Sequence, residues 1–501
     1  MSLRTIAAGL WFFAAPLAGL GGGPGAAEIP PALPAFTPCQ LEHPQGILTV
    51  TAECTTVAVP EDYQQPAGRQ LELFVARVPA LNRRKQPDPL VILAGGPGLG
   101  ASVFYPGIAA NLARVRRDRD ILIVDQRGTG RSNPLNCAFD EQKMWEASDE
   151  ETARVMAACL AQLSQKNDVA QFTTSVAVRD LESVRVALGY AQLDFYASSY
   201  GTRVAQHYAR RYPAQTRALI LDGVIPPPLV LGPGTPLDAR AALDRLFARC
   251  VEDEACHGRF GDPREDYEAL RTRLARESVH LSLPDPRTGA PTELDFNGDA
   301  FAGALRLTGY SADRAALLPL MLKLANRDGR YGPLAAQFVL TASGYDDVIA
   351  YGMHNSVVCS EDVPLYRDAH IDREALARTY LGTAQVDSLR ALCKDWPRGP
   401  MDDDLHAPLK SSAPALLLSG TADPVTPAAY GDEAAKGFAN AVHVKVRDQG
   451  HGQIVQPCVD RVIARFLQLA ATPSSISSLD AKCLTELAPP PFFLSLSGPA
   501  P

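Results

Sequence analysis

The sequence predicts an α/β fold in which a mostly parallel sheet is covered by helices on both faces. A first observation is a set of short, continuous apolar runs, typical of strands buried on both sides; they are residues 89–94, 120–125, 193–197, 217–222, 413–420 and 441–446. A second is that apolar residues recur at helical spacing between these runs, as in 176–188 and 202–212. Such alternation indicates a parallel sheet. A third observation is that the alternation stops at about 226 and resumes after 406, which predicts a large, mainly helical cap inserted before the last core strands.

These patterns divide the chain into four predicted segments. A signal peptide covers residues 1–27, the first part of the α/β core 28–225, the cap 226–406, and the second part of the core with a tail 407–501. Within the first part of the core, alternating apolar residues between positions 57 and 78 predict antiparallel edge strands.

The N-terminus has the composition of an export signal. Arg4 precedes an apolar run from Ile6 to Leu20, and small residues then lead to Ala27, the predicted cleavage site. The alternative is an N-terminal anchor that stays attached, although the run is short for a membrane span and Pro16 interrupts it. We therefore expect an exported protein, periplasmic or secreted, without a membrane contact after cleavage.

Composition agrees with an exported globular protein. The 501 residues carry a net charge of −8, and no basic stripe suggests a nucleic-acid partner. Ten cysteines, with no Cys-x-x-Cys motif that would indicate a metal site, predict a disulfide framework. We expect neither a metal nor a cofactor. In chain order they form five local pairs, the simplest connectivity; the cysteines are 39 and 54, 137 and 159, 250 and 256, 359 and 393, and 458 and 483.

Ser199 lies at the most informative turn of the chain. The apolar run 193–197 precedes it, a helical pattern follows it, and small residues stand two positions before and after it, Ala197 and Gly201. Such a turn is typical of a nucleophile elbow, which exposes one hydroxyl above a sheet. The alternative is an ordinary strand–turn–helix with two serines.

An elbow serine needs a general base and an acid that orients the base. His451, between two glycines, follows the run 441–446, and Asp423 follows 413–420. Because the carboxyl ends of parallel strands meet at one edge of a sheet, we expect both residues near Ser199. Asp222, which also ends a strand, is the alternative acid.

The oxyanion formed on attack needs backbone donors. We expect the N–H groups of Tyr200 and of Gly96, the latter in the loop Gly95-Gly96-Pro97-Gly98. The alternative for this loop is a dinucleotide-binding fingerprint, Gly96-x-Gly98-x-x-Ala101 with Asp125 at the end of the next strand. Pro106 and Gly107 in the helix that should follow speak against it, as does the export signal.

Five motifs occur in an order known from one enzyme family. They are Gly95-Gly-Pro-Gly98, Asp125-Gln-Arg-Gly-Thr-Gly-Arg-Ser132, Ser199-Tyr-Gly-Thr202, Gly420-Thr-Ala-Asp-Pro-Val-Thr-Pro427 and Gly450-His-Gly452. With these motifs the chain resembles the proline iminopeptidase/tripeptidyl aminopeptidase family of α/β-hydrolases, in its exported branch with a tripeptidyl-aminopeptidase-like C-terminal segment. The likeness runs from about Cys54 to Cys483.

The chain departs from that family at two places. Ala197-Ser198 stands where the family usually has Gly-Gly before the nucleophile, and Ala94 stands where proline iminopeptidases usually have His. Despite both departures we still expect acyl transfer. Neither departure favours a specificity for proline in the substrate.

The resemblance implies an exported serine aminopeptidase that hydrolyses residues or short peptides from free peptide N-termini through a Ser-His-Asp triad. Such an enzyme needs a carboxylate for the substrate ammonium, and we expect it in the cap at Glu361 of Cys359-Ser-Glu-Asp362, held by a bridge such as Cys359–Cys393. The alternative for Glu361 is a solvated acidic residue. Asp125 and Arg127 are expected to be structural.

The sequence leaves two other functions open. A carboxylesterase would use the same triad without any need for a free amine on its substrate. A binding protein on a hydrolase scaffold would have no activity at all. The sequence predicts neither the oligomeric state nor the number of residues removed.

Overall fold

The computed structural model describes residues 33–137, 147–346 and 348–497. The chain from Pro34 onward forms one compact unit. The predicted signal peptide and its cleavage site lie outside the described residues.

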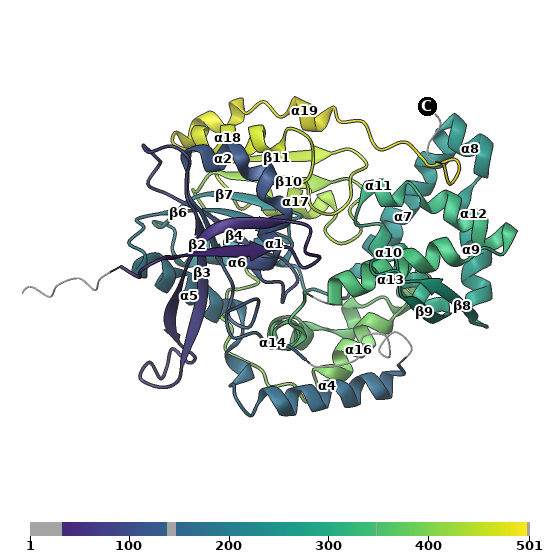
Figure 1. Ribbon diagram of the computed structural model, residues 1–501, viewed down its shortest axis with the longest axis horizontal. Helices are drawn as coiled ribbons and strands as arrows, with labels where there is room; N and C mark the ends of the chain where they lie inside the picture. Colours follow the sequence, from purple (N-terminus) through teal and green to yellow (C-terminus); the bar gives the residue numbers. More distant parts are fainter. Residues whose placement is uncertain (1–32, 138–146, 347, 498–501) are drawn as a thin grey trace, which may run out of the picture. The chain divides into compact units, whose positions relative to one another are not determined.

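A nine-stranded sheet organises this unit, in the order β1-β2-β3-β5-β4-β6-β7-β10-β11 (Figure 1). The strands are β1 (Thr37–Glu42), β2 (Thr49–Pro60), β3 (Gln70–Val78), β4 (Leu90–Leu93), β5 (Ile121–Val124), β6 (Leu193–Ser198), β7 (Thr216–Asp222), β10 (Ala415–Gly420) and β11 (Ala441–Val446). The pairs from β5 to β11 are parallel, whereas β1, β2 and β3 pair antiparallel at one edge. The predicted fold class and the antiparallel edge strands are confirmed.

The central strands are apolar along their whole length because helices cover both faces of the sheet. Every residue of β4 and β5 is buried. Along β4, Val91 and Leu93 point into one core cluster and Leu90 and Ile92 into the other, as strand alternation requires. The first cluster includes residues of α5 (Thr174–Ala187) and α6 (Tyr200–Arg211), and the second includes residues of α1 (Ala101–Ile108), α2 (Ala113–Asp118) and α18 (Val459–Leu469).

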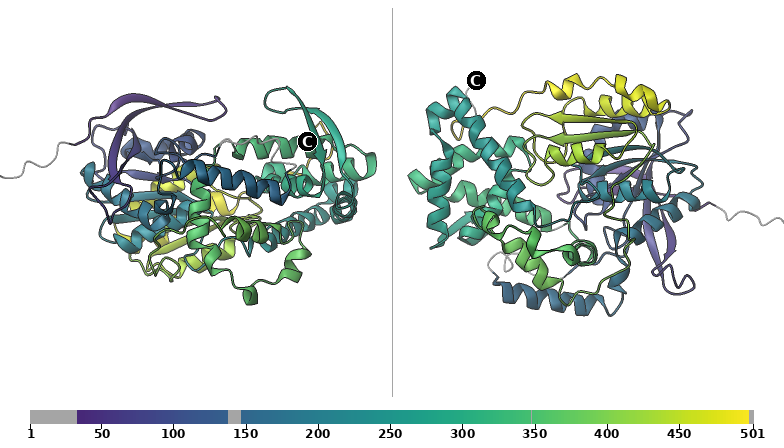
Figure 2. Two further views of the ribbon diagram at one scale, coloured as in Figure 1. Left: turned by 90° about the horizontal axis from the view of Figure 1, so that it is seen from below. Right: turned by 180° about the vertical axis from the view of Figure 1, so that it is seen from behind.

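The sheet is interrupted between β7 and β10 by a segment of helices, which we call the cap. Its helices are α7 (Thr235–Glu252), α8 (Glu254–Phe260), α9 (Pro263–Leu274), α10 (Gly298–Thr308), α11 (Ala312–Ala315), α12 (Leu318–Asp328), α13 (Gly332–Asp346), α14 (Tyr351–Glu361), α15 (Arg373–Ala377) and α16 (Ala384–Leu392). Helices α7 to α13 stay grouped together in all views (Figures 1 and 2). The exact limits of the two core segments that flank the cap, residues 225 and 407, stay predictions.

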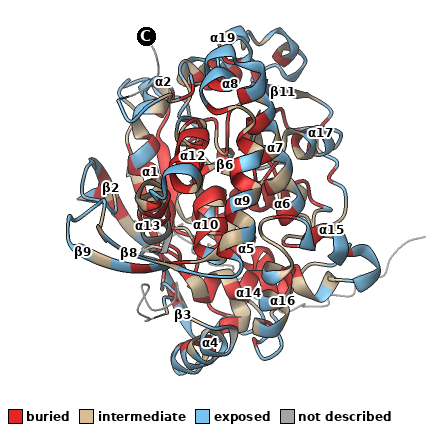
Figure 3. Ribbon diagram, turned by 90° about the vertical axis from the view of Figure 1, so that its right-hand side faces the viewer, coloured by how far each residue is buried: buried red, intermediate tan, exposed pale blue. Residues whose placement is uncertain are grey.

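The cap has its own apolar core. Residues of α7, α9, α10, α12 and α13 form one buried cluster. Figure 3 shows α10 and α12 as largely buried, whereas α4 (Asp149–Leu163) exposes most of its length. Helices α11 and α12 follow each other closely and part at residues 316–317, just before Pro319.

One hairpin in the cap was not predicted. Strands β8 (Val279–Pro284) and β9 (Pro291–Phe296) pair antiparallel apart from the large sheet. In β8, half-buried and exposed residues alternate, and the polar turn 285–290 joins the strands. This period-2 pattern was readable, but the helical patterns around it favoured a mainly helical cap without a predicted hairpin.

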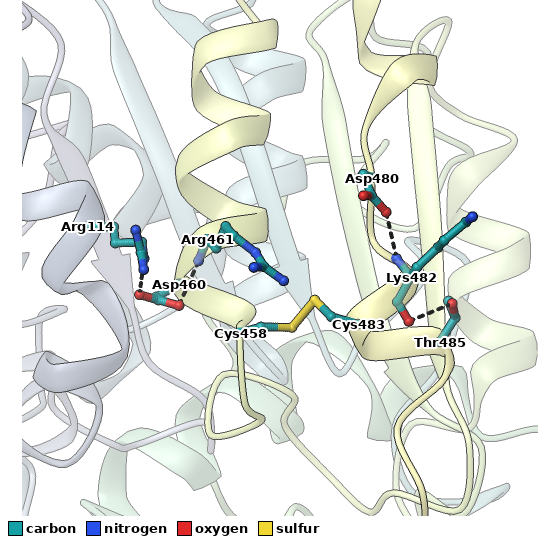
Figure 4. The surroundings of a disulfide bond; sticks show 8 residues. All are labelled: Arg114, Cys458, Asp460, Arg461, Asp480, Lys482, Cys483 and Thr485. Atoms are coloured by element: carbon teal, nitrogen blue, oxygen red, sulfur yellow. Dashed lines mark hydrogen bonds and ion pairs between the residues drawn. A yellow bond between two sulfur atoms is a disulfide. The ribbon is translucent and has the colours of Figure 1, made fainter.

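The ten cysteines pair in chain order, so the simplest predicted connectivity is confirmed. The disulfides are Cys39–Cys54, Cys137–Cys159, Cys250–Cys256, Cys359–Cys393 and Cys458–Cys483. The last joins the start of α18 to α19 (Lys482–Thr485), beside the Arg114–Asp460 ion pair (Figure 4). Among the described helices, none combines the length and the apolar character that a membrane span requires.

Candidate active site

Ser199 occupies a strained turn between β6 and α6. Its backbone has φ 54° and ψ −123°, a region that L-residues rarely adopt and that is found at functional sites. Small neighbours permit this turn. A Cβ at Gly201 would lie 2.7 Å from the backbone oxygens of Leu93 and Ala94, and a Cβ at Gly95 would lie 2.9 Å from the Ser199 Cβ.

Asp423 and His451 meet beyond the ends of β10 and β11. The Asp423 Oδ2 atom lies 2.8 Å from the His451 Nδ1 atom. The carboxylate also accepts the N–H groups of Val425 and Thr426 and the Thr426 hydroxyl. Since both side chains of the pair are nearly buried, the Asp423 carboxylate fixes the Nδ1–H tautomer, which leaves Nε2 as the proton acceptor.

Two opposing effects act on the His451 imidazole. Burial by itself lowers the pKa of His451, but the charge of Asp423 and its hydrogen bond, with Asp222 nearby, raise the pKa to a net value above the usual 6.5. Tyr310 of the cap supports the same residue. The Tyr310 carbonyl accepts the backbone N–H of His451 at 2.8 Å. The Tyr310 ring packs edge-on to the imidazole, with 5.3 Å between the ring centroids.

Asp222, the alternative acid, has a different set of partners. It accepts the N–H groups of Gln453 and Ile454 and the hydroxyl of Tyr196. Burial raises the pKa of Asp222 to about 6, against the lowering effect of these hydrogen bonds and of His451. Asp222 therefore holds the loop that follows His451, whereas Asp423 accepts the hydrogen bond from the imidazole.

Ser199 and His451 line one cavity of about 420 Å³ between the sheet edge and the cap. Gly95 and Gly96, of the loop Gly95–Gly98, line it too. The backbone of Gly96 has φ +106°, and a Cβ there would lie 2.7 Å from the Gly98 nitrogen, so a side chain would distort the loop. Tyr200 places its phenol away in the core, near Thr174, so its N–H is the group available as an oxyanion donor.

The cap contacts the loop Gly95–Gly98 through residues that the sequence did not single out. The Gly98 carbonyl accepts the N–H of Ala350 at 3.0 Å. His354, which lines the cavity, hydrogen-bonds the Pro97 carbonyl, and burial lowers the pKa of His354 despite that bond. His354 lies inside an unbroken helix without a motif, so no sequence pattern marked it.

Glu361 does not lie among the described residues that line the cavity. Its side chain is fully buried, and it accepts the N–H of Thr174 at 2.6 Å and the Thr174 hydroxyl at 2.8 Å. Arg203 of α6 lies 3.4 Å from Glu361 and forms a bidentate pair with Asp362. Burial raises the pKa of Glu361 to about 7, with Arg203 lowering it and Asp362 raising it. These contacts connect the cap to the elbow helix.

The cavity itself has little charge. Arg306 of α10 is the one Lys, Arg, Asp or Glu side chain among the described lining residues, and its Nη1 lies 3.3 Å from Oε1 of the Gln385 side chain. Thr235, Tyr310 and His354 add neutral polar groups. In the described part of the chain, no group of three or more His, Cys, Asp or Glu side chains could hold a metal ion.

Asp125 and Arg127 have the contacts of structural residues. The Asp125 carboxylate accepts the N–H and hydroxyl of Ser102 and the N–H of Arg131. Arg127 forms a buried bidentate pair with Asp180. Both oxygens of Asp125 thus stabilise the loops beside the elbow, an arrangement that differs from the ribose contact of a dinucleotide site.

Comparisons with known proteins bear on this site. Residues 88–254 match the family model of the alpha/beta hydrolase fold, and residues 378–483 match the model of TAP-like proteins. Serine protease Hip1 of Mycobacterium tuberculosis is 27% identical, over 89% of this chain and 90% of that protein. Carboxylesterase B of the same organism is 28% identical, over 95% of this chain and 96% of that protein.

A third relative is the Tripeptidyl aminopeptidase of Streptomyces lividans, which is 23% identical over 88% of this chain and 85% of that protein. The two family models cover the elbow strand and the strands that precede Asp423 and His451. Together with the sheet order described above, these matches show the α/β-hydrolase fold, with a C-terminal segment similar to TAP-like proteins.

Proposed function

We propose that the chain is an exported serine aminopeptidase whose catalytic residues are Ser199, His451 and Asp423. The observation that carries the proposal is the strained Ser199 turn and the Asp423–His451 pair facing one cavity. The serine protease and tripeptidyl aminopeptidase relatives support a peptide as the substrate. Five disulfides support export, because such bonds persist in oxidising compartments.

The proposed reaction has two stages. The Ser199 hydroxyl attacks the scissile carbonyl while His451 Nε2 takes its proton, and Asp423 stabilises the resulting imidazolium. The N–H groups of Tyr200 and Gly96 stabilise the oxyanion. His451 then gives the proton to the leaving amine, and a water molecule, activated in the same way, hydrolyses the acyl-enzyme.

A carboxylesterase is the second candidate. No Asp or Glu is among the described residues that line the cavity, so none of them offers a carboxylate to a substrate ammonium. One of the relatives is itself named a carboxylesterase. The expected role of Glu361 as the ammonium ligand would require it to leave Thr174 and Arg203, with which it now interacts.

The experiment that separates the two candidates compares free and N-acetylated chromogenic mono-, di- and tripeptides. An aminopeptidase should hydrolyse the free-amine substrates at least about tenfold faster, since an acetyl group removes the charge that a peptidase of this kind recognises. Ser199→Ala should be inactive on both sets while it folds normally. Equal rates on free and blocked substrates, both lost in Ser199→Ala, would favour the esterase.

A further inference from the structure

A second hollow adjoins the cavity that Ser199 lines. This groove, of about 590 Å³, runs between α1 and the cap and is also bordered by the β1–β2 loop at residues 43–45. Four residues line both hollows: Leu99, Phe104, Ile108 and Tyr310. The two hollows are therefore neighbours that meet at these four residues.

Tyr310 indicates which part of a substrate would enter the groove. His451 must give its proton to the leaving group, so the leaving group lies on the imidazole side of the attacked carbon. Tyr310 packs against that imidazole and also lines the groove. The path from the imidazole past Tyr310 thus leads the leaving group into the groove.

Arg314 is the arginine that lines the groove. It lies in the short helix α11, half-buried, and burial lowers the pKa of its guanidinium. Its guanidinium has no hydrogen bond or ion pair among the residues whose side chains the structure describes, and no Asp or Glu is among those of them that line the groove. A half-buried guanidinium without a protein carboxylate is suited to bind one from a ligand, because its planar fork matches a carboxylate bidentately.

We propose that this groove binds the leaving peptide and that Arg314 binds the C-terminal carboxylate of that peptide. The preferred substrates are then short peptides with a free C-terminus, whose end can reach Arg314 while the scissile bond is at Ser199. The apolar residues of the groove, such as Val103 and Leu307, contact the side chains of the leaving peptide. This inference rests on the proposed peptidase function.

The test uses unblocked tetrapeptides, pentapeptides and hexapeptides, each prepared as the C-terminal acid and as the amide. In the native enzyme at neutral pH, kcat/KM should be about tenfold higher for the best acid than for its amide, as a charge-assisted hydrogen-bond pair would give. Arg314→Ala should reduce the acid-to-amide ratio to about one, and Arg314→Lys should retain part of it. Hydrolysis of chromogenic aminoacyl and peptidyl anilides, which have no leaving carboxylate, should be unchanged.

Arg84→Ala is the matched control, because Arg84 is exposed in the loop between β3 and β4 and its loss changes the net charge equally. It should leave the ratio unchanged. Acid and amide peptides cleaved equally by the native enzyme, or a ratio insensitive to Arg314→Ala, would overturn the groove proposal and leave the peptidase function standing. Hydrolysis of esters without hydrolysis of any unblocked peptide or anilide would overturn both.

Discussion

Asp222 and Asp423 both end strands of the parallel sheet near His451, yet they have different partners. Asp423 accepts a hydrogen bond from the His451 imidazole. Asp222 accepts hydrogen bonds from backbone N–H groups of the loop that follows His451. Both were predicted from their place after an apolar run. The choice between them depended on which loop turns back over the histidine, and no local pattern determines that.

A pair of substitutions separates the two aspartates. Asp423→Asn should lower kcat by about 10³-fold or more, because an amide there favours the wrong imidazole tautomer. Asp222→Asn should lower the free energy of unfolding by about 1–3 kcal/mol, since it weakens buried hydrogen bonds, and should lower kcat far less. Steady-state kinetics and urea unfolding of both variants measure these effects. A larger loss of kcat in Asp222→Asn, with unchanged stability, would reverse the assignment.

Other residues of the site were less readable from the sequence. The triad was predicted because each member follows a strong strand pattern. Glu361 was singled out beside a cysteine in the cap, but whether its carboxylate faces the cavity or Arg203 is decided by the packing of α14 on α6. His354 and Arg314 belong to no sequence motif. Whether a single helix residue faces a cavity depends on the elements packed against that helix, and these cannot be read from the sequence around it.

At the scale of elements, the contact between α6 and the end of β4 holds the elbow. Gly201, the second residue of α6, lies directly against the carbonyls of Leu93 and Ala94. The strands of this region were predicted nearly to their ends because they are continuously apolar. The cap elements were predicted less well, since short helices and the β8–β9 hairpin depend on contacts with each other.

Gly201→Ala tests the close approach at the elbow. The new Cβ would lie 2.7 Å from two backbone oxygens, so helix and strand must separate. We expect a loss of about 1–3 kcal/mol in the free energy of unfolding, together with a loss of activity. The matched control is Gly258→Ala in α8, where a Cβ meets nothing within 4 Å and alanine should stabilise by up to about 1 kcal/mol. Equal stability changes in the two variants would contradict this account.

At the scale of the whole molecule, the C-terminal tail returns from the core to the cap. Phe492 is buried in the apolar cluster of the cap, with the Arg249 guanidinium 4.1 Å above its ring, and the N–H of Phe493 bonds the Ala316 carbonyl. The inserted cap was predicted from the interruption of the strand pattern. The path of the tail was not, because a proline-rich segment without periodicity gives no indication of its partner.

Phe492→Ala tests whether the tail stabilises the cap. Removal of a buried aromatic ring should lower the free energy of unfolding by about 3 kcal/mol, which thermal or urea unfolding measures. Leu496→Ala, at a position that is 63% exposed, should have an effect within about 0.5 kcal/mol. A loss in Phe492→Ala no larger than in that control would show that the tail contributes little.

The most direct test of the proposed triad is the rate at which a fluorophosphonate labels the protein, followed by mass spectrometry between pH 5 and 8. We expect one adduct, on Ser199, which His451→Ala abolishes. Because the pKa of His451 is raised, the imidazole is protonated below that value and cannot take the serine proton. Labelling should therefore be fast at high pH and fall as the pH decreases through a value above 6.5. An adduct on another residue, or a rate on Ser199 that does not change over this range, would contradict the account.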